Sequence, residues 1–146
     1  MLKQTILAFF GSIFPVILFN IDRKKVFWAG LSGVVGWVVY SLIYYSTNSP
    51  AMPSFFGAFA VGIYSEAMAR KFKTPAFVFL IPGIFPLVPG ITAYNTLRFI
   101  VENNISEAFN KGIQTVVVGG DIAFGVMLST AIFKFISKIR SKSRSS

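Results

Sequence analysis

A cluster of prolines inside an apolar stretch is the feature that most constrains the fold of this chain. Residues 76–101 contain one charged residue, Arg98, and as a helix they would be about 39 Å long, enough to cross a bilayer. Three prolines and two adjacent glycines lie in the middle of the stretch: Pro82, Gly83, Pro86, Pro89 and Gly90. Each proline removes a backbone donor and clashes with the preceding turn. We therefore predict a membrane-crossing helix that is broken between about 82 and 90, near the bilayer centre.

A broken helix at that depth predicts a binding site. Opened backbone has no water to satisfy it in lipid, so it is tolerated only against protein or beside a wet cavity. The half-helix that starts near Pro89 has free N–H groups and a positive dipole end, which favour a carboxylate. The predicted substrate-binding residues are those of the break and the polar residues that follow it: Pro86, Pro89, Gly90, Thr92, Tyr94, Asn95 and Arg98. The alternative is a kinked helix whose polar side chains satisfy the opened backbone, with Arg98 paired to Glu102.

The composition indicates an all-α polytopic membrane protein. Hydrophobic residues make up 54% of the chain, 17 residues are Phe, and only 13% are charged. The net charge of +9 comes from short basic clusters between apolar runs. Such clusters are typical of loops beside anionic lipid headgroups, and we expect no nucleic-acid binding. Because the chain has no Cys and no His, thiol and imidazole chemistry are absent, and we expect neither an enzyme nor a metal or cofactor site.

Five apolar stretches are candidate spans, and the fourth is the broken one: 5–20, 26–45, 54–70, 76–101 and 112–135. The predicted organisation is a single transmembrane domain over 1–136 and a basic tail over 137–146. Basic residues at 22–25, at 70–73 and in the tail would then share one side, which the positive-inside rule makes cytoplasmic. We expect a multi-pass protein of the cell membrane with a cytoplasmic C-terminus. A four-span arrangement with a re-entrant fourth stretch stays open.

Small residues on two candidate spans predict close helix packing. They are Ala29, Ser32, Gly33 and Gly36 on the second span, and Ala58 and Gly62 on the third. Small side chains let helix backbones approach each other in a membrane. These faces would pack against another subunit, or they reflect the general abundance of glycine in membrane helices.

Two acids lie inside candidate spans and are the predicted proton-coupling residues. Asp121 lies about nine residues into the last span, where an acid is costly unless it faces protein or water. A helix cap or an inter-helix hydrogen bond is the alternative role for Asp121. Glu66 is the second candidate, although an ion pair with Arg70 four residues later is the simpler interpretation.

The proline motif also resembles a known family. The run PLVPGITAY, with Pro86, Pro89, Gly90 and Tyr94 as its skeleton and SEAMARKFKTPA before it, resembles the threonine/serine exporter family. The resemblance is best over residues 62–96. The length of the chain is similar to the small membrane subunit of the split form of that family, in which a second, larger membrane subunit supplies the other half.

The resemblance implies export of a small anionic or zwitterionic substrate, either threonine and serine or C4 dicarboxylates such as succinate. It also implies coupling to the proton-motive force. Asp121 matches no family motif, so its role rests on its depth alone. The competing hypothesis is an assembly or regulatory subunit that docks a partner through its glycine faces and never contacts substrate.

Overall fold

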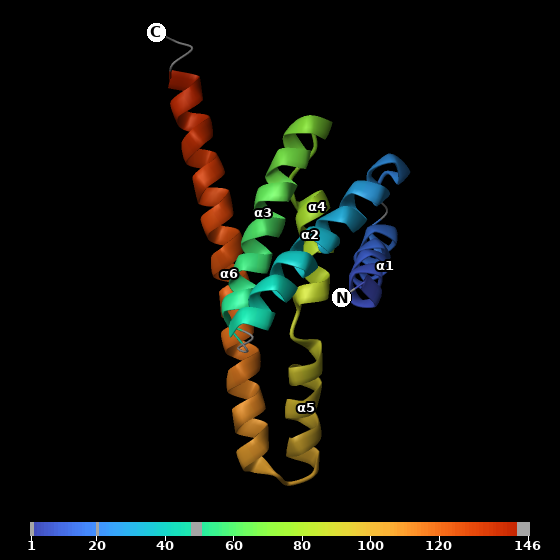
Figure 1. Cartoon of the computed structure of the whole chain (residues 1–146), viewed down its shortest axis with the longest axis vertical. Helices are drawn as coiled ribbons and strands as arrows, with labels where there is room; N and C mark the ends of the chain where they lie inside the picture. The colour runs from blue at the N-terminus through green and yellow to red at the C-terminus, as the bar shows by residue number, and fades with distance from the viewer. Residues whose placement is uncertain (1, 20, 48–50, 143–146) are drawn as a thin grey trace.

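The computed structural model describes residues 2–19, 21–47 and 51–142, and these residues fold into helices and short connections (Figure 1). The elements are α1 (Leu2–Leu18), α2 (Arg23–Thr47), α3 (Ala51–Phe72), α4 (Phe77–Ile84), the 3-10 turn η1 (Phe85–Leu87), α5 (Gly90–Val101) and α6 (Ile105–Lys142). The predicted all-α fold is confirmed. Asn20 at the end of the predicted first span, 48–50 in the turn after the second span, and 143–146 in the predicted tail lie outside the described residues.

Two helices are long and apolar enough to cross a membrane by themselves, namely α2 and the Ile105–Ile139 part of α6. The bent pair Phe77–Leu87 and Gly90–Val101 would be a third span if it crosses as one unit. The apolar helix α1 has 17 residues and is shorter than these. The protein is thus an all-α membrane protein, and the count of five spans stays a prediction.

Helix α3 lies between α2 and α6 and packs closely against both (Figure 1). Glycines make the approach to α6 possible on both helices. A Cβ atom at Gly62 of α3 would collide with Ser129 of α6, and one at Gly125 of α6 would lie 2.5 Å from the carbonyl oxygen of Phe55. Ala58 and Val61 of α3 also form a buried cluster with apolar residues of η1 and α6. These contacts hold α6 against α3.

The predicted packing face of the second span is confirmed, and it packs inside this chain. A Cβ atom at Gly33 would collide with Ser12 of α1, and one at Gly36 would lie 2.5 Å from a methyl group of Val61. Ala29 is fully buried. Because this face is occupied by α1 and α3, it is not free to dock another subunit.

Helix α4 packs against α1, α2 and α3. Phe79 is fully buried and packs with Val16 and Ala29. The hydroxyl of Ser32 donates a hydrogen bond of 2.9 Å to the carbonyl oxygen of Phe79. Gly83 lies so close to Ser32 that a Cβ atom there would collide with the Ser32 hydroxyl. These contacts fix the position of α4, and the break begins at the end of this helix.

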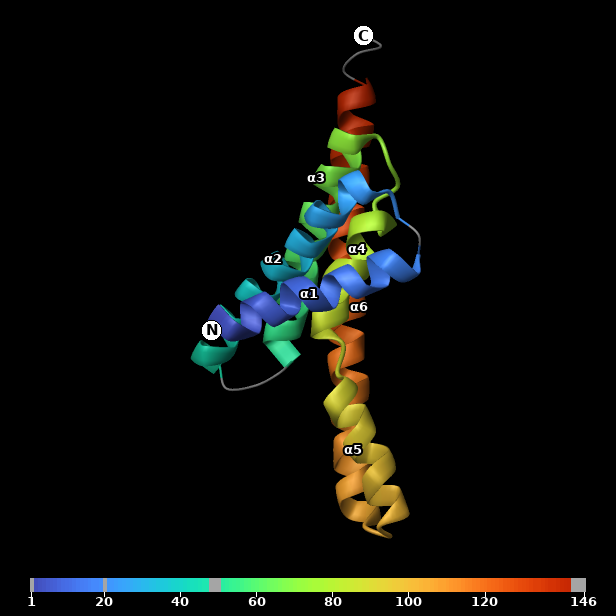
Figure 2. The same ribbon diagram turned by 90° about the vertical axis from the view of Figure 1, so that its right-hand side faces the viewer.

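Helices α5 and α6 form a hairpin that extends beyond the other helices (Figures 1 and 2). Two asparagines make the turn. Asn103 has φ of 57°, a conformation that asparagine tolerates better than most residues, and the N–H of Asn104 donates to the carbonyl of Phe99 at 2.9 Å. The side chain of Asn104 then accepts from the N–H of Glu107 at 3.3 Å and caps α6. Among its described residues, α5 buries none.

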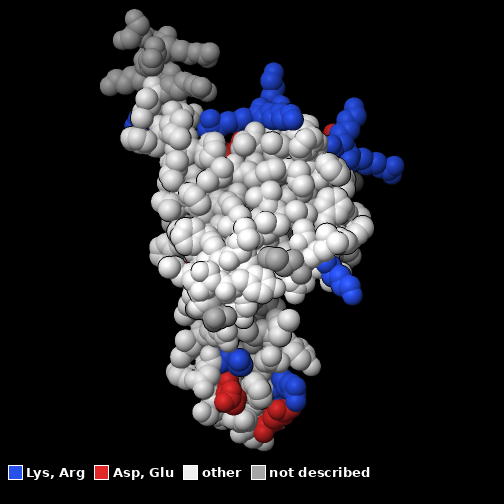
Figure 3. All heavy atoms as spheres, viewed as in Figure 1, with Lys and Arg blue, Asp and Glu red and all other residues white. Residues whose placement is uncertain are grey.

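Most of the charged side chains visible in Figure 3 lie at the two ends of the molecule. At the end where α2 begins and α3 ends, Lys71 lies 4.5 Å from the ring centre of Trp28, and Arg70 donates to the carbonyl of Phe133 at 3.3 Å. On α6, residues 112–133 contain only Asp121 as a charged residue, over about 33 Å of helix. That length matches the hydrocarbon thickness of a bilayer. Helix α6 continues to Lys142, into the predicted tail.

Candidate functional site

The predicted helix break is confirmed, and it is narrower than the sequence indicates. Helix α4 runs through Pro82, and Pro86 lies at the start of η1, where a missing N–H costs nothing. Val88 is extended, with ψ of 131°, because a residue before proline avoids the helical conformation. Pro89 has φ of −76° and ψ of 54°, and the N–H of Gly90 donates to the carbonyl of Val88 at 2.8 Å, which makes an inverse γ-turn. The chain bends by 51° here.

The start of α5 presents unpaired backbone donors. Its N-cap is Pro89, which has no side-chain hydrogen bond to offer the first turn. The N–H of Ala93 and the hydroxyl of Thr92 both donate to the carbonyl of Pro89, at 3.0 and 2.9 Å. Within the described part of the chain, the N–H groups of Ile91 and Thr92 have no backbone acceptor. The hydroxyl of Thr92 thus satisfies the opened backbone, while two N–H groups stay available.

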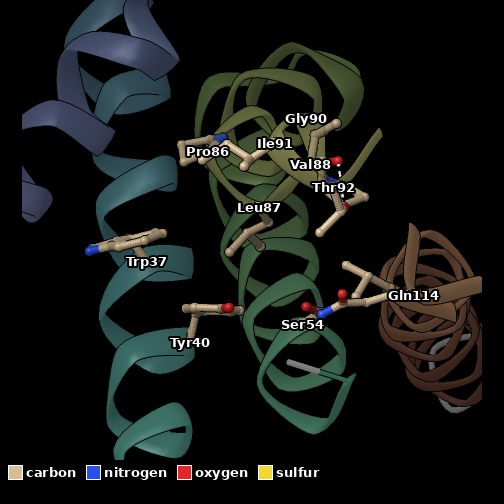
Figure 4. A pocket seen from close by; sticks show the side chains of 12 residues that line it. Trp37, Tyr40, Ser54, Pro86, Leu87, Val88, Gly90, Ile91, Thr92 and Gln114 are labelled. Carbon is tan, nitrogen blue, oxygen red and sulfur yellow. Dashed lines mark hydrogen bonds between the residues drawn. The ribbon is translucent and has the colours of Figure 1, made fainter. Parts of the chain in front are cut away.

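A cavity of about 210 Å³ lies directly beside the break (Figure 4). One wall is the segment 86–92. The other walls come from three helices: Trp37 and Tyr40 of α2, Ser54 of α3, and Gln114 and Val118 of α6. The cavity therefore lies where the broken helix meets three other helices.

The structure brings four of the seven predicted binding residues to this cavity, namely Pro86, Pro89, Gly90 and Thr92. The other three lie farther along α5, outside the cavity lining. The side chain of Tyr94 is 67% exposed. The Nε atom of Arg98 lies 2.8 Å from a carboxylate oxygen of Glu102, as the kinked-helix alternative expects. Asn95 is half-buried.

The polar side chains of the opposite wall were not predicted from the sequence. Tyr40, Ser54 and Gln114 come from three different helices, and only the folded arrangement brings them together. A signal existed for Gln114, since an amide inside an apolar span is costly without a partner. Of the described residues that line the cavity, none carries a charge.

The two predicted proton-coupling acids lie outside the cavity lining. Asp121 is half-buried on α6, about two turns after Gln114 on the same face, and its Oδ2 atom is buried without a hydrogen-bond partner. Glu66 is half-buried on α3. Its expected partner Arg70 contacts α6 instead, with its guanidinium 4.8 Å from the ring centre of Phe133. Among the residues described, no group of three or more acids could hold a metal ion.

A second cavity, of about 260 Å³, shares Trp37 and Pro86 with the first as lining residues. Its remaining lining residues all come from α1: Gln4, Leu7, Ala8 and Gly11. The two cavities are therefore neighbours beside α2 and the helix break.

Comparison with known proteins identifies the family. The family model described as "Threonine/Serine exporter, ThrE" matches residues 4–132. The chain is 27% identical over 107 residues to a threonine/serine exporter of Corynebacterium glutamicum, covering 73% of this chain and 22% of that protein. It is 32% identical over 97 residues to pheromone-regulated membrane protein 10 of Eremothecium gossypii, covering 61% of this chain and 13% of that protein. No solved structure matches the chain.

The chain thus spans less than a quarter of the length of these curated relatives. The family model nevertheless covers most of the chain, and the broken helix lies within the matched residues. The protein therefore belongs to the threonine/serine exporter family.

Proposed function

We propose that this protein is a membrane subunit of a secondary transporter that exports small hydrophilic metabolites. The substrates in question are threonine and serine or C4 dicarboxylates such as succinate. Membership of the exporter family supports transport. The observation that carries the proposal is the cavity at the start of α5, where an opened helix meets polar groups of three other helices.

The cavity suits a small metabolite that carries a carboxylate. Its volume of about 210 Å³ is below the about 300–1,000 Å³ of sites for drug-sized ligands. The unpaired N–H groups of Ile91 and Thr92 and the dipole of α5 favour a negatively charged group at this edge. Arg98 would contribute only if its pair with Glu102 opened. Pro86, Pro89, Gly90 and Thr92 are thus the proposed contacts in the ground state.

The proposed complex contains a second, larger membrane subunit of the same family. The match to the Corynebacterium exporter covers 22% of that protein, and the family resemblance implies a second subunit that supplies the other half. Apolar side chains cover the outer surface of the α5–α6 hairpin, where Ile91, Val101 and Phe109 are 79%, 82% and 67% exposed. An apolar groove of about 690 Å³ also runs between α5 and α6. Such a surface needs lipid or another protein chain as a cover.

The proposed topology has five spans and a cytoplasmic C-terminus in the cell membrane. The end of the molecule that carries the basic residues 23–25 and 70–73 would face the cytoplasm and its anionic headgroups (Figure 3). An odd number of spans lets a homologous partner insert in the opposite orientation, as in many secondary transporters. In alternating access, this chain and its homologous partner would then move against each other around the helix break.

Asp121 is the proposed carrier of the coupling proton. It lies about 15 Å from Lys111 along α6, near the middle of residues 112–133, in which it is the one charged residue. A carboxylate oxygen without a hydrogen-bond partner is costly at that depth, and a role in proton transfer would explain its position. Glu66 is the weaker candidate, because it lies closer to the basic end of α3.

An export assay with matched glycine variants tests the proposal. Cells would produce the chain with the larger family member of its source organism, and efflux of preloaded labelled threonine or succinate would be measured. A Cβ atom has open space at both Gly90, which lines the cavity, and Gly119, which lies on the exposed face of α6. We expect Gly90→Leu to abolish export and Gly119→Leu to retain it at equal membrane levels. Equal export by both variants would rule out the cavity as the transport site.

A further inference from the structure

We propose that Gln114, together with Tyr40, determines the specificity of the cavity by binding the substrate from the side opposite the helix break. This inference rests on the proposed function, because it concerns the same cavity. Neither residue belongs to the proline motif.

The first observation is that both polar groups are unpaired. Within the described ranges, neither the Gln114 amide nor the Tyr40 hydroxyl takes part in a hydrogen bond. An unpaired amide in an apolar span costs free energy, and a ligand that pairs with it recovers that cost. The two rings next to the cavity, Trp37 and Tyr40, stack with their centres 5.3 Å apart, which holds the Tyr40 hydroxyl in place.

The second observation is where these groups point. In Figure 4 the Tyr40 hydroxyl extends from α2 into the cavity, and the Gln114 amide extends towards it from α6 on the opposite side, next to Ser54. The free N–H groups of α5 lie at the third side. A ligand that places its carboxylate on α5 therefore presents its remaining polar groups to Gln114 and Tyr40.

The third observation is that the cavity lining is uncharged, so it favours a ligand without net charge. A second carboxylate would meet the amide and the hydroxyl without a balancing cation, which is costly in a low-dielectric site. The amide oxygen of Gln114 and the hydroxyl oxygen of Tyr40 can instead accept hydrogen bonds from an ammonium or hydroxyl group. The cavity should thus prefer a zwitterion to a dicarboxylate.

The test measures the concentration dependence of export for Gln114→Leu and Tyr40→Phe, with labelled threonine and succinate as probes. Each variant removes one hydrogen-bonding group, so we expect KM for threonine to rise about 10-fold with little change in the maximal rate. The control is Gln4→Leu, which makes the same change in the second cavity and should keep the parent KM. A merely structural role would lower the maximal rate or the membrane level instead.

The outcome separates this inference from the proposed function. If Gly90→Leu abolishes export but both variants keep the parent KM, the cavity transports and the role of Gln114 and Tyr40 is refuted. Faster export of succinate than of threonine by the parent protein would refute the preference for a zwitterion. If Gly90→Leu leaves export unchanged, the transport site itself is wrong and this inference falls with it.

Discussion

Adding one methyl group at Gly83 should weaken the packing of α4 that positions the helix break. A Cβ atom at Gly83 would lie 2.6 Å from a methyl carbon of Val61 and 3.0 Å from the Cβ atom of Ser32, with the Ser32 hydroxyl closer still. Both neighbours are fully buried, and Ser32 is held by its hydrogen bond to Phe79. Since neither neighbour can move aside, Gly83→Ala should cost about 1–3 kcal/mol through overpacking.

Gly120→Ala is the matched control, because a Cβ atom there meets nothing within 4 Å. Both glycines lie inside helices, so both variants gain the same helix propensity of about 0.5–1 kcal/mol. The difference in melting temperature between them therefore isolates the overpacking. At about 2–4 °C per kcal/mol, Gly83→Ala should melt about 2–12 °C below Gly120→Ala in detergent. Equal melting temperatures would refute the close packing of α4 on α2 and α3.

Two further predictions concern charged residues outside the cavity. Arg98→Ala should leave melting temperature and export near the parent values, because Arg98 pairs with Glu102 in an exposed position four residues away, and such pairs contribute little; a loss of export as large as that of Gly90→Leu would instead place Arg98 on the substrate. Asp121→Asn should abolish accumulation driven by a pH gradient in membrane vesicles but retain exchange of labelled for unlabelled substrate, because the neutral amide cannot carry a proton. Gradient-driven transport at the parent rate by this variant would exclude Asp121 from coupling.

The helix break was predictable because proline acts locally. The exact position of the break was harder to predict, because all three prolines look equally disruptive in the sequence. Pro82 is accommodated within α4, and Pro86 lies at the start of η1, where its missing donor is not needed. Only at Pro89 does the preceding residue leave the helical conformation.

Contacts between segments that are far apart in the chain could not be predicted from the sequence. Glycines such as Gly33 and Gly36 predicted close packing, but not that their partners are α1 and α3 of the same chain. The cavity wall formed by Tyr40, Ser54 and Gln114 depends on how three helices are placed around the break. Arg98 shows the opposite case, because its neighbour at i+4 was visible in the sequence and is its partner in the fold.

The central claim is that the break at Val88–Gly90 opens a water-accessible cavity that binds the exported metabolite. The chain has no Cys, so a single introduced thiol is the only one in this chain, and the complex with unsubstituted Thr92 measures the background from other thiols. The most direct measurement is the rate at which a membrane-impermeant methanethiosulfonate reagent modifies Thr92→Cys in inside-out vesicles and in whole cells. We predict modification from at least one side of the membrane and slower modification when threonine or succinate is present. A thiol at residue 92 that stays unreactive from both sides, or that reacts at the same rate with and without either metabolite, would contradict the account.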